Sequence, residues 1–174
     1  MTPSDIGLLV LRLGVGVVIM HGLMKLGWVG KGGSVKGTGA WFASMGLKPG
    51  YLWAWVVVLA ETVGVALTVL GLGGPIGPGV VAADMTVVTI VAHWPKGFWA
   101  GAGGWEFPVP IAAGALAVAT IGNGTLSLDH ALGLTYPDWL GSTWAVLMAI
   151  GVILPLLMRA LFAPKPAPQA QKTA

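Results

Sequence analysis

The sequence predicts an all-α integral membrane protein, and this prediction rests on its composition. Of the 174 residues, 56% are hydrophobic and only 9% are charged, whereas a soluble domain carries about 25% charged residues. So few charges could not cover a globule in water, and disorder is excluded because it requires low hydrophobicity. The 28 glycines fit packed membrane helices, in which small residues let two backbones approach closely.

Five apolar stretches are candidates for crossing the bilayer, which takes about 20 mostly apolar residues. They cover residues 6–26, 52–72, 76–94, 107–122 and 139–162. We expect the fourth, which is short, to lie nearly upright or to continue inside the protein. Pro155 should kink the fifth stretch or end its regular part. The tail 163–174, with three prolines and two glutamines, is typical of a disordered end.

The lysines and arginines outside the apolar core predict the orientation, because they concentrate on the cytoplasmic side. Eight lie on one side of the predicted bundle: Lys25, Lys31, Lys36, Lys48, Lys96, Arg159, Lys165 and Lys172. The N-terminus, the 73–75 hairpin and the 123–138 loop on the other side carry none. We therefore expect the N-terminus outside and the C-terminus in the cytoplasm.

Several kinds of chemistry are excluded by composition. The chain has no cysteine, which rules out disulfides, thiolate metal sites and iron–sulfur clusters within it. The net charge of +3 is too small and too scattered to suggest a nucleic-acid partner.

Three charged residues fall near the middle of the predicted spans, namely Arg12, Glu61 and Asp84. Each would cost at least about 2.5–3.5 kcal/mol in hydrocarbon if unpaired, so all three should face the bundle. We expect an Arg12–Glu61 ion pair, because consecutive spans tend to be neighbours. Asp84 is then either protonated or shares Arg12 with Glu61. The three residues fit a structural ion pair that fixes helix register, a proton or quinone site, or an ion path.

His21 and Lys25 form a second polar group at the cytoplasmic end of the first span. Their spacing of four places them on one helix face, half a turn out of phase with Arg12. Together they could hold a quinone carbonyl; alternatively, they are a histidine and a snorkelling lysine at the headgroups. His93 lies at the same depth on the third span, but two histidines are weak evidence for haem. We expect no haem and no metal.

Residues 38–46 could form a short interfacial helix that Thr38 caps, with Trp41, Phe42 and Met45 on one face. The alternative is an ordinary loop that rests on the membrane.

An ordered set of motifs resembles the DoxX family of small membrane proteins. It comprises Arg12-Leu-Gly, His21-Gly-Leu-x-Lys25-Leu-Gly, Gly37-Thr-Gly-Ala-Trp-Phe-Ala-Ser-Met-Gly-Leu, Glu61-x-x-Gly64, Gly97-Phe-Trp, Glu106 and Gly122-Asn-Gly124-x-x-Ser-Leu-Asp129. The resemblance implies a four-helix membrane bundle, here over 1–138. It is followed by an additional transmembrane helix over 139–162, absent from the family pattern, which suggests docking, and by a disordered cytoplasmic tail over 163–174.

The resemblance also implies a link to quinone, since the family includes proteins associated with quinone-dependent oxidoreductases such as thiosulfate:quinone oxidoreductase. We expect a multi-pass protein of a bacterial or archaeal cell membrane. It would act as a subunit of a quinone-linked redox complex, binding quinone or docking membrane or peripheral redox subunits. Because the sequence shows no electron carrier of its own, two alternatives remain: a non-catalytic structural subunit of a larger assembly, and a small transporter or proton path.

Overall fold

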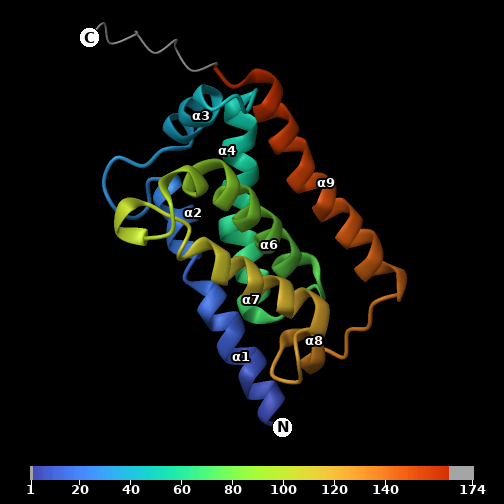
Figure 1. Ribbon diagram of the computed structural model, residues 1–174. Coiled ribbons are helices and arrows are strands. Elements are labelled where there is room, and N and C mark those ends of the chain that lie inside the picture. Colours follow the sequence, from blue (N-terminus) through green and yellow to red (C-terminus); the bar gives the residue numbers. More distant parts are fainter. Residues whose placement is uncertain (1, 165–174) are drawn as a thin grey trace, which may run out of the picture.

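The structure, a computed structural model, describes residues 2–164, and all regular secondary structure in that range is helical. Figure 1 shows a bundle in which the start of α1 and the end of α9 lie at opposite ends. The α-helices are α1 (Pro3–Gly16), α2 (Ile19–Lys25), α3 (Val35–Ser44), α4 (Gly50–Leu59), α5 (Val65–Leu70), α6 (Ile76–Val88), α7 (Pro108–Ile121), α8 (Leu128–Ala131) and α9 (Trp139–Phe162).

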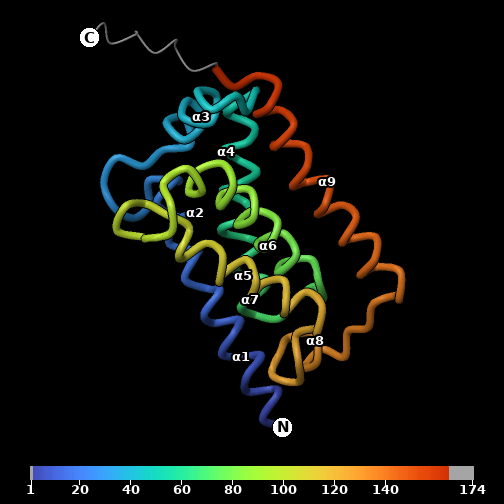
Figure 2. Tube along the Cα trace, viewed as in Figure 1, coloured from blue at the N-terminus to red at the C-terminus, as the bar shows by residue number. Residues whose placement is uncertain are grey.

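Four helical stretches are long and apolar enough to cross a membrane: Pro3–Lys25, Gly50–Leu70, Ile76–Lys96 and Trp139–Phe162. The prediction of an all-α membrane protein is thereby confirmed. The path of the chain between them can be followed in Figure 2.

The remaining predicted span, 107–122, is the helix α7, which has 14 residues. At about 1.5 Å per residue it is some 21 Å long, less than the roughly 30 Å of hydrocarbon. Asn123 and Ser127 in the loop after it are buried, so the chain continues inside the protein. Irregular backbone is tolerated at membrane depth where protein covers it.

The first span begins with a reciprocal cap. The Thr2 hydroxyl accepts a hydrogen bond from the Asp5 backbone N–H at 3.3 Å, and the Asp5 carboxylate accepts one from the Thr2 N–H at 2.7 Å. Pro3 stands at the first helical position, where a missing N–H is no loss. The helix is interrupted after Gly16 and resumes as α2.

Two π-helical turns interrupt the second and third spans. One, η1 (Ala60–Gly64), separates α4 from α5, and the other, η2 (Thr89–His93), extends α6. A π turn makes room for one extra residue and often occurs at functional sites. Here each turn carries one charged or titratable side chain, Glu61 or His93.

The hairpin between α5 and α6 depends on close approach of their backbones. A Cβ atom added at Gly77 would lie 2.7 Å from the Leu67 Cβ and 2.8 Å from the Gly64 carbonyl oxygen. Only glycine fits there, which agrees with the role expected of small residues between membrane helices.

The segment expected to be an interfacial helix forms α3, although its start differs from the prediction. Ser34, not Thr38, is the cap, because its hydroxyl accepts from the Gly37 N–H at 3.0 Å. Phe42 is buried and packs in a cluster with Leu47 and Val57. The position of α3 at a membrane surface stays a prediction.

The last helix, α9, packs against α6 and is fastened to it at both ends. The indole Nε1 of Trp144 donates to the Ile76 carbonyl at 3.2 Å, and Arg159 Nη1 donates to the Val91 carbonyl at 2.6 Å. In a regular helix the Val91 carbonyl would accept from residue 95, but Pro95 has no N–H. Arg159 therefore supplies a donor that the sequence of the third span lacks.

Pro155 is buried inside α9, and the helix runs on through it to Phe162. Of the two predicted effects, an end of the regular helix at Pro155 is therefore wrong. The tail predicted over 163–174 lies, beyond Pro164, outside the described residues.

Candidate functional site

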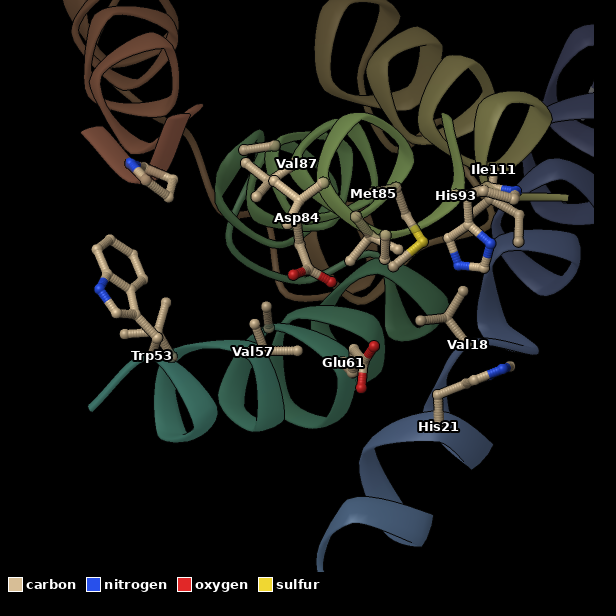
Figure 3. Close-up of a pocket in the computed structure, with 18 of the residues that line it drawn as sticks. Val18, His21, Trp53, Val57, Glu61, Asp84, Met85, Val87, His93 and Ile111 are labelled. Carbon is tan, nitrogen blue, oxygen red and sulfur yellow. The ribbon is translucent and has the colours of Figure 1, made fainter. Parts of the chain in front are cut away.

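The bundle holds a partly open cavity of about 520 Å³, lined by residues of α2, α3, α4, η1, α6, η2, α7 and α9. Ligand sites in proteins commonly measure about 300–1,000 Å³. Most of the wall is aliphatic or aromatic, and the side chains that can carry charge are His21, Lys25, Glu61, Asp84 and His93. Figure 3 shows Asp84 and Glu61 directed into the cavity, with His21 and His93 on one side of it.

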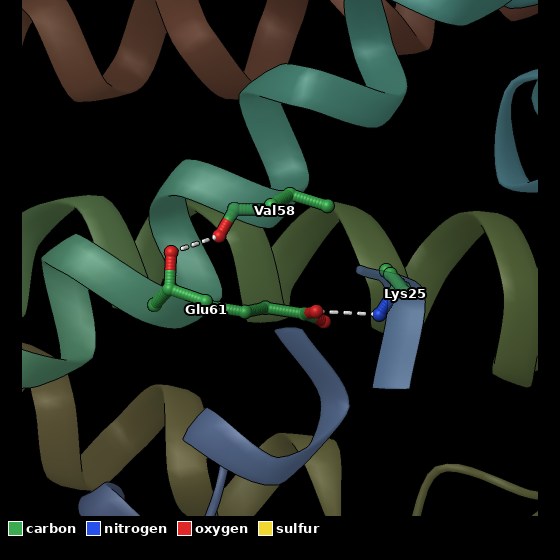
Figure 4. A network of polar contacts seen from close by, with 4 residues as sticks. Lys25, Val58 and Glu61 are labelled. Atoms are coloured by element: carbon green, nitrogen blue, oxygen red, sulfur yellow. Dashed lines mark hydrogen bonds and ion pairs between the residues drawn. The ribbon is translucent and has the colours of Figure 1, made fainter. Parts of the chain in front are cut away.

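Four of the five residues expected to form the site thus meet at one cavity, but their pairing differs from the prediction. Lys25 Nζ donates to Glu61 Oε2 at 2.5 Å, with the two side chains only 15% and 4% exposed. Figure 4 shows this contact between α2 and the π turn η1. The expected Arg12–Glu61 ion pair is wrong, because the α2 end of the first span, and not α1, packs against η1.

Asp84 belongs to α6 and lines the same cavity. Its Oδ2 atom is buried and has no hydrogen-bond partner among residues 2–164. The alternative in which Asp84 shares Arg12 with Glu61 does not hold either, since both carboxylates lie at the cavity and Arg12 is absent from its wall. A polar atom buried without a partner is costly, so Asp84 calls for a functional explanation.

The two histidines lie on the opposite side of the cavity from Trp53 in Figure 3. The ring of His93 is held by a 2.7 Å hydrogen bond between Nδ1 and the Gly103 carbonyl. A carbonyl only accepts, so Nδ1 carries the proton and Nε2 of the neutral ring is an acceptor. His21 is exposed and also contributes to the cavity wall. The ring of His21, on the first span, is therefore accessible to a ligand in the cavity.

Arg12, on α1, has a different task, away from the cavity wall. It is only 1% exposed, and its guanidinium donates to the carbonyls of Asn123 at 2.7 Å and Leu126 at 2.5 Å. Those carbonyls belong to the irregular loop after α7, which offers no helical partners for them. Arg12 therefore donates hydrogen bonds to buried backbone carbonyls and does not pair with a carboxylate among residues 2–164.

The same loop is tied to the 73–75 hairpin through Asp129, which sequence reasoning had left unassigned. Its two carboxylate oxygens accept from the backbone N–H groups of Gly73 and Gly74 at 2.9 and 2.8 Å. They also accept from Tyr136 Oη at 2.6 Å and Asn123 Nδ2 at 2.7 Å. The available signal was the Gly122-to-Asp129 motif, which combines turn residues with a carboxylate.

Asp129 makes stability depend on pH. Burial alone would raise the pKa of its carboxyl, but the hydrogen bonds from Tyr136, Gly73, Gly74 and Asn123 outweigh burial and lower it. With a lowered folded-state pKa, the stabilisation is complete above the unfolded value of about 3.9 and is lost as pH falls through the folded value.

We therefore expect the free energy of unfolding to fall more steeply in the natural protein than in Asp129→Asn as the pH drops below about 4. The variant itself should be less stable at pH 7 by about 1.5–3 kcal/mol, the value of a hydrogen bond to a charged group. Unfolding curves of the detergent-solubilised protein across this pH range would test both statements. Identical pH slopes in the two proteins would contradict the assignment.

Gly71 closes α5 in the left-handed conformation, with φ of 64°. A Cβ atom there would overlap Arg12 Nη1 and lie 2.6 Å from the Ser127 Cβ. We expect Gly71→Ala to lower the free energy of unfolding by more than the roughly 1 kcal/mol of the backbone term, because it also displaces the guanidinium. Gly141→Ala, in open space on α9, is the matched control for thermal unfolding; equal melting temperatures would show that Arg12 can move aside.

Within residues 2–164 no three His, Asp or Glu side chains gather as metal ligands would. Apolar helices of spanning length, with buried charges between them, define a multi-pass membrane protein. The chain belongs to the DoxX family, whose model matches residues 7–94. That match holds Arg12, His21, Lys25, Glu61, Asp84 and His93, and ends before α7 and α9. No match was found among curated proteins or solved structures.

Proposed function

We propose that the cavity binds the head of a quinone and that the protein is a membrane subunit of a quinone-linked redox complex. The observation that supports this most is the cavity itself, which sets a few titratable side chains in an apolar wall. A quinone needs one or two hydrogen-bond donors for its carbonyls and apolar walls for its ring and tail. His21 and the remaining N–H groups of Lys25 would be the donors.

The electrons would have to come from a partner, because the chain holds no cysteine and offers no carrier of its own. The family's association with quinone-dependent oxidoreductases agrees with such a role. In this proposal the protein binds and positions the quinone, and a separate redox subunit reduces or oxidises it.

The test is to purify the protein in lipid nanodiscs, extract and identify any bound quinone, and titrate the empty protein with a short-tailed benzoquinone and a short-tailed naphthoquinone. We expect saturable binding that His21→Leu weakens about tenfold, as the loss of one hydrogen bond would. His130→Leu, an exposed histidine of α8, is the matched control. If no quinone is extracted and neither compound binds saturably, the proposal is wrong.

A second candidate function is that of a structural subunit, and α9 is the observation that favours it. Only 6% of its most apolar window is buried, which leaves a long face for a neighbouring membrane protein. Gentle purification followed by identification of co-purifying subunits would support this role if a stable partner is lost on deletion of α9.

We also propose the orientation with the N-terminus outside and the C-terminus in the cytoplasm. A reporter that is active only in the cytoplasm, fused after the C-terminus, should be active, and one active only outside the membrane should be silent. The same outside-active reporter inserted between Gly73 and Gly74 should work. The opposite pattern would show that the lysine and arginine count does not decide the orientation of this protein.

A further inference from the structure

The side of the cavity that faces α9 has a composition of its own. Asp84 from α6, Trp53 from α4 and the Gly151–Pro155 turn of α9 line it. In Figure 3 Asp84 lies between Trp53 on one side of the cavity and His21 and His93 on the other. α9 lies outside the part of the chain that the family model matches, so this site is partly built from an element beyond the match.

One carboxylate oxygen and one indole N–H are buried here without a partner among residues 2–164. Asp84 Oδ2 has no donor among residues 2–164. Pro155, which has no backbone N–H to donate, lines the cavity as well. The indole Nε1 of Trp53, also unpartnered among the described residues, can serve an oxygen atom of a ligand or a water molecule.

The charges point the same way. Glu61 from η1 and Lys25 from α2 neutralise each other in an ion pair, while His21 and His93 approach from the far side. An ionised Asp84 therefore gives the cavity one uncompensated negative charge. Such a charge in an apolar site is unfavourable unless a proton or a cation neutralises it.

The walls suit a cation that carries apolar groups. Trp53 and Phe42 present aromatic rings, which attract ammonium ions most strongly where water is excluded, and valines of α4 and α6 complete the lining. We propose that this side of the cavity binds an organic ammonium ion with an apolar body, which displaces the proton of Asp84. The carboxylic acid releases its proton to water as the cation enters and pairs with the carboxylate, and no other bond changes. This site does not depend on quinone binding.

The experiment measures binding of octylammonium to the full chain in nanodiscs by calorimetry, with 1-octanol as the uncharged match. We expect saturable octylammonium binding that 1-octanol does not displace. Since one proton leaves for each cation bound, affinity should rise about tenfold per pH unit where Asp84 is protonated. Asp84→Asn should weaken binding about thirtyfold or more, as loss of one partner of a buried charge pair does, and remove the pH dependence.

Asp84→Glu, which keeps the acid, should retain binding, and Asp138→Asn, an exposed acid outside the cavity, should bind as the natural protein does. Melting temperatures of the same samples show whether each variant is folded, and short-tailed quinone binding is measured beside them. Unchanged octylammonium binding by Asp84→Asn, displacement by 1-octanol, or no saturable binding to the natural protein would each overturn the proposal. Loss of quinone binding alone would overturn only the quinone function.

Discussion

Replacing Glu61 by glutamine is expected to lower the free energy of unfolding by about 3–5 kcal/mol, because it leaves Lys25 as an uncompensated charge inside the bundle. The Lys25 and Glu61 side chains are only 15% and 4% exposed and lie 2.5 Å apart. Lys25→Met should destabilise the protein for the same reason, with Glu61 then unpaired. Unfolding by a denaturing detergent, followed by circular dichroism, would measure the loss.

The double variant Lys25→Met/Glu61→Gln should recover much of that loss, because it removes both charges and leaves no unpaired one. Lys31→Met, at an exposed lysine, controls for the general effect of removing a positive charge. If the double variant is as unstable as the sum of the two single ones, Lys25 and Glu61 do not stabilise each other and Glu61 has another partner.

Arg12→Met should destabilise the protein by about 3–6 kcal/mol, the sum of two hydrogen bonds from a charged group at about 1.5–3 kcal/mol each. The carbonyls of Asn123 and Leu126 would lose their donors inside the protein. Arg12→Lys should recover only part of this, since one ammonium group cannot reproduce the fork of the guanidinium.

The measurement for Arg12 is again detergent unfolding, with Lys36→Met at an exposed position of α3 as the control. Because Arg12 lies away from the cavity wall, octylammonium and quinone binding to the still-folded fraction should survive Arg12→Lys. Loss of ligand binding in a stable Arg12→Lys protein would contradict the separation between a structural end and a ligand-binding end.

Much of the fold follows from hydrophobicity, because a bilayer allows few ways to place an apolar stretch of 20 residues. The opposite phase of Arg12 and Lys25 on the first span was also readable. The partners of Arg12 and Lys25 could not be predicted in this way. The assumption that consecutive spans pair ignores the break after Gly16 and the loop after α7, whose carbonyls accept from Arg12. A sequence does not show which carbonyl groups of an irregular loop need a hydrogen-bond donor, and so Arg12 was expected to pair with an acid.

The sequence predicted two separate polar groups, Glu61 and Asp84 with Arg12 near the midplane and His21 with Lys25 at the cytoplasmic end, but not that four of these residues meet at one cavity. Charged side chains inside a membrane must face protein, so each of these side chains could occupy only a few positions in the bundle. The π turns that direct Glu61 and His93 inward depend on packing between helices. No residue pattern in the two spans indicates them.

The closing of one cavity wall by α9 has a consequence for how such chains diversify. A relative that ends after the helix equivalent to α8 would lack this wall, so that lipid tails could enter the cavity that Asp84 lines, and an acid among lipid tails is costly. We therefore expect the acid and the fifth helix to be gained and lost together among related sequences, as a single inherited unit. A helix appended to an older bundle would then have added a new selectivity to it without altering the residues that hold the original four helices together.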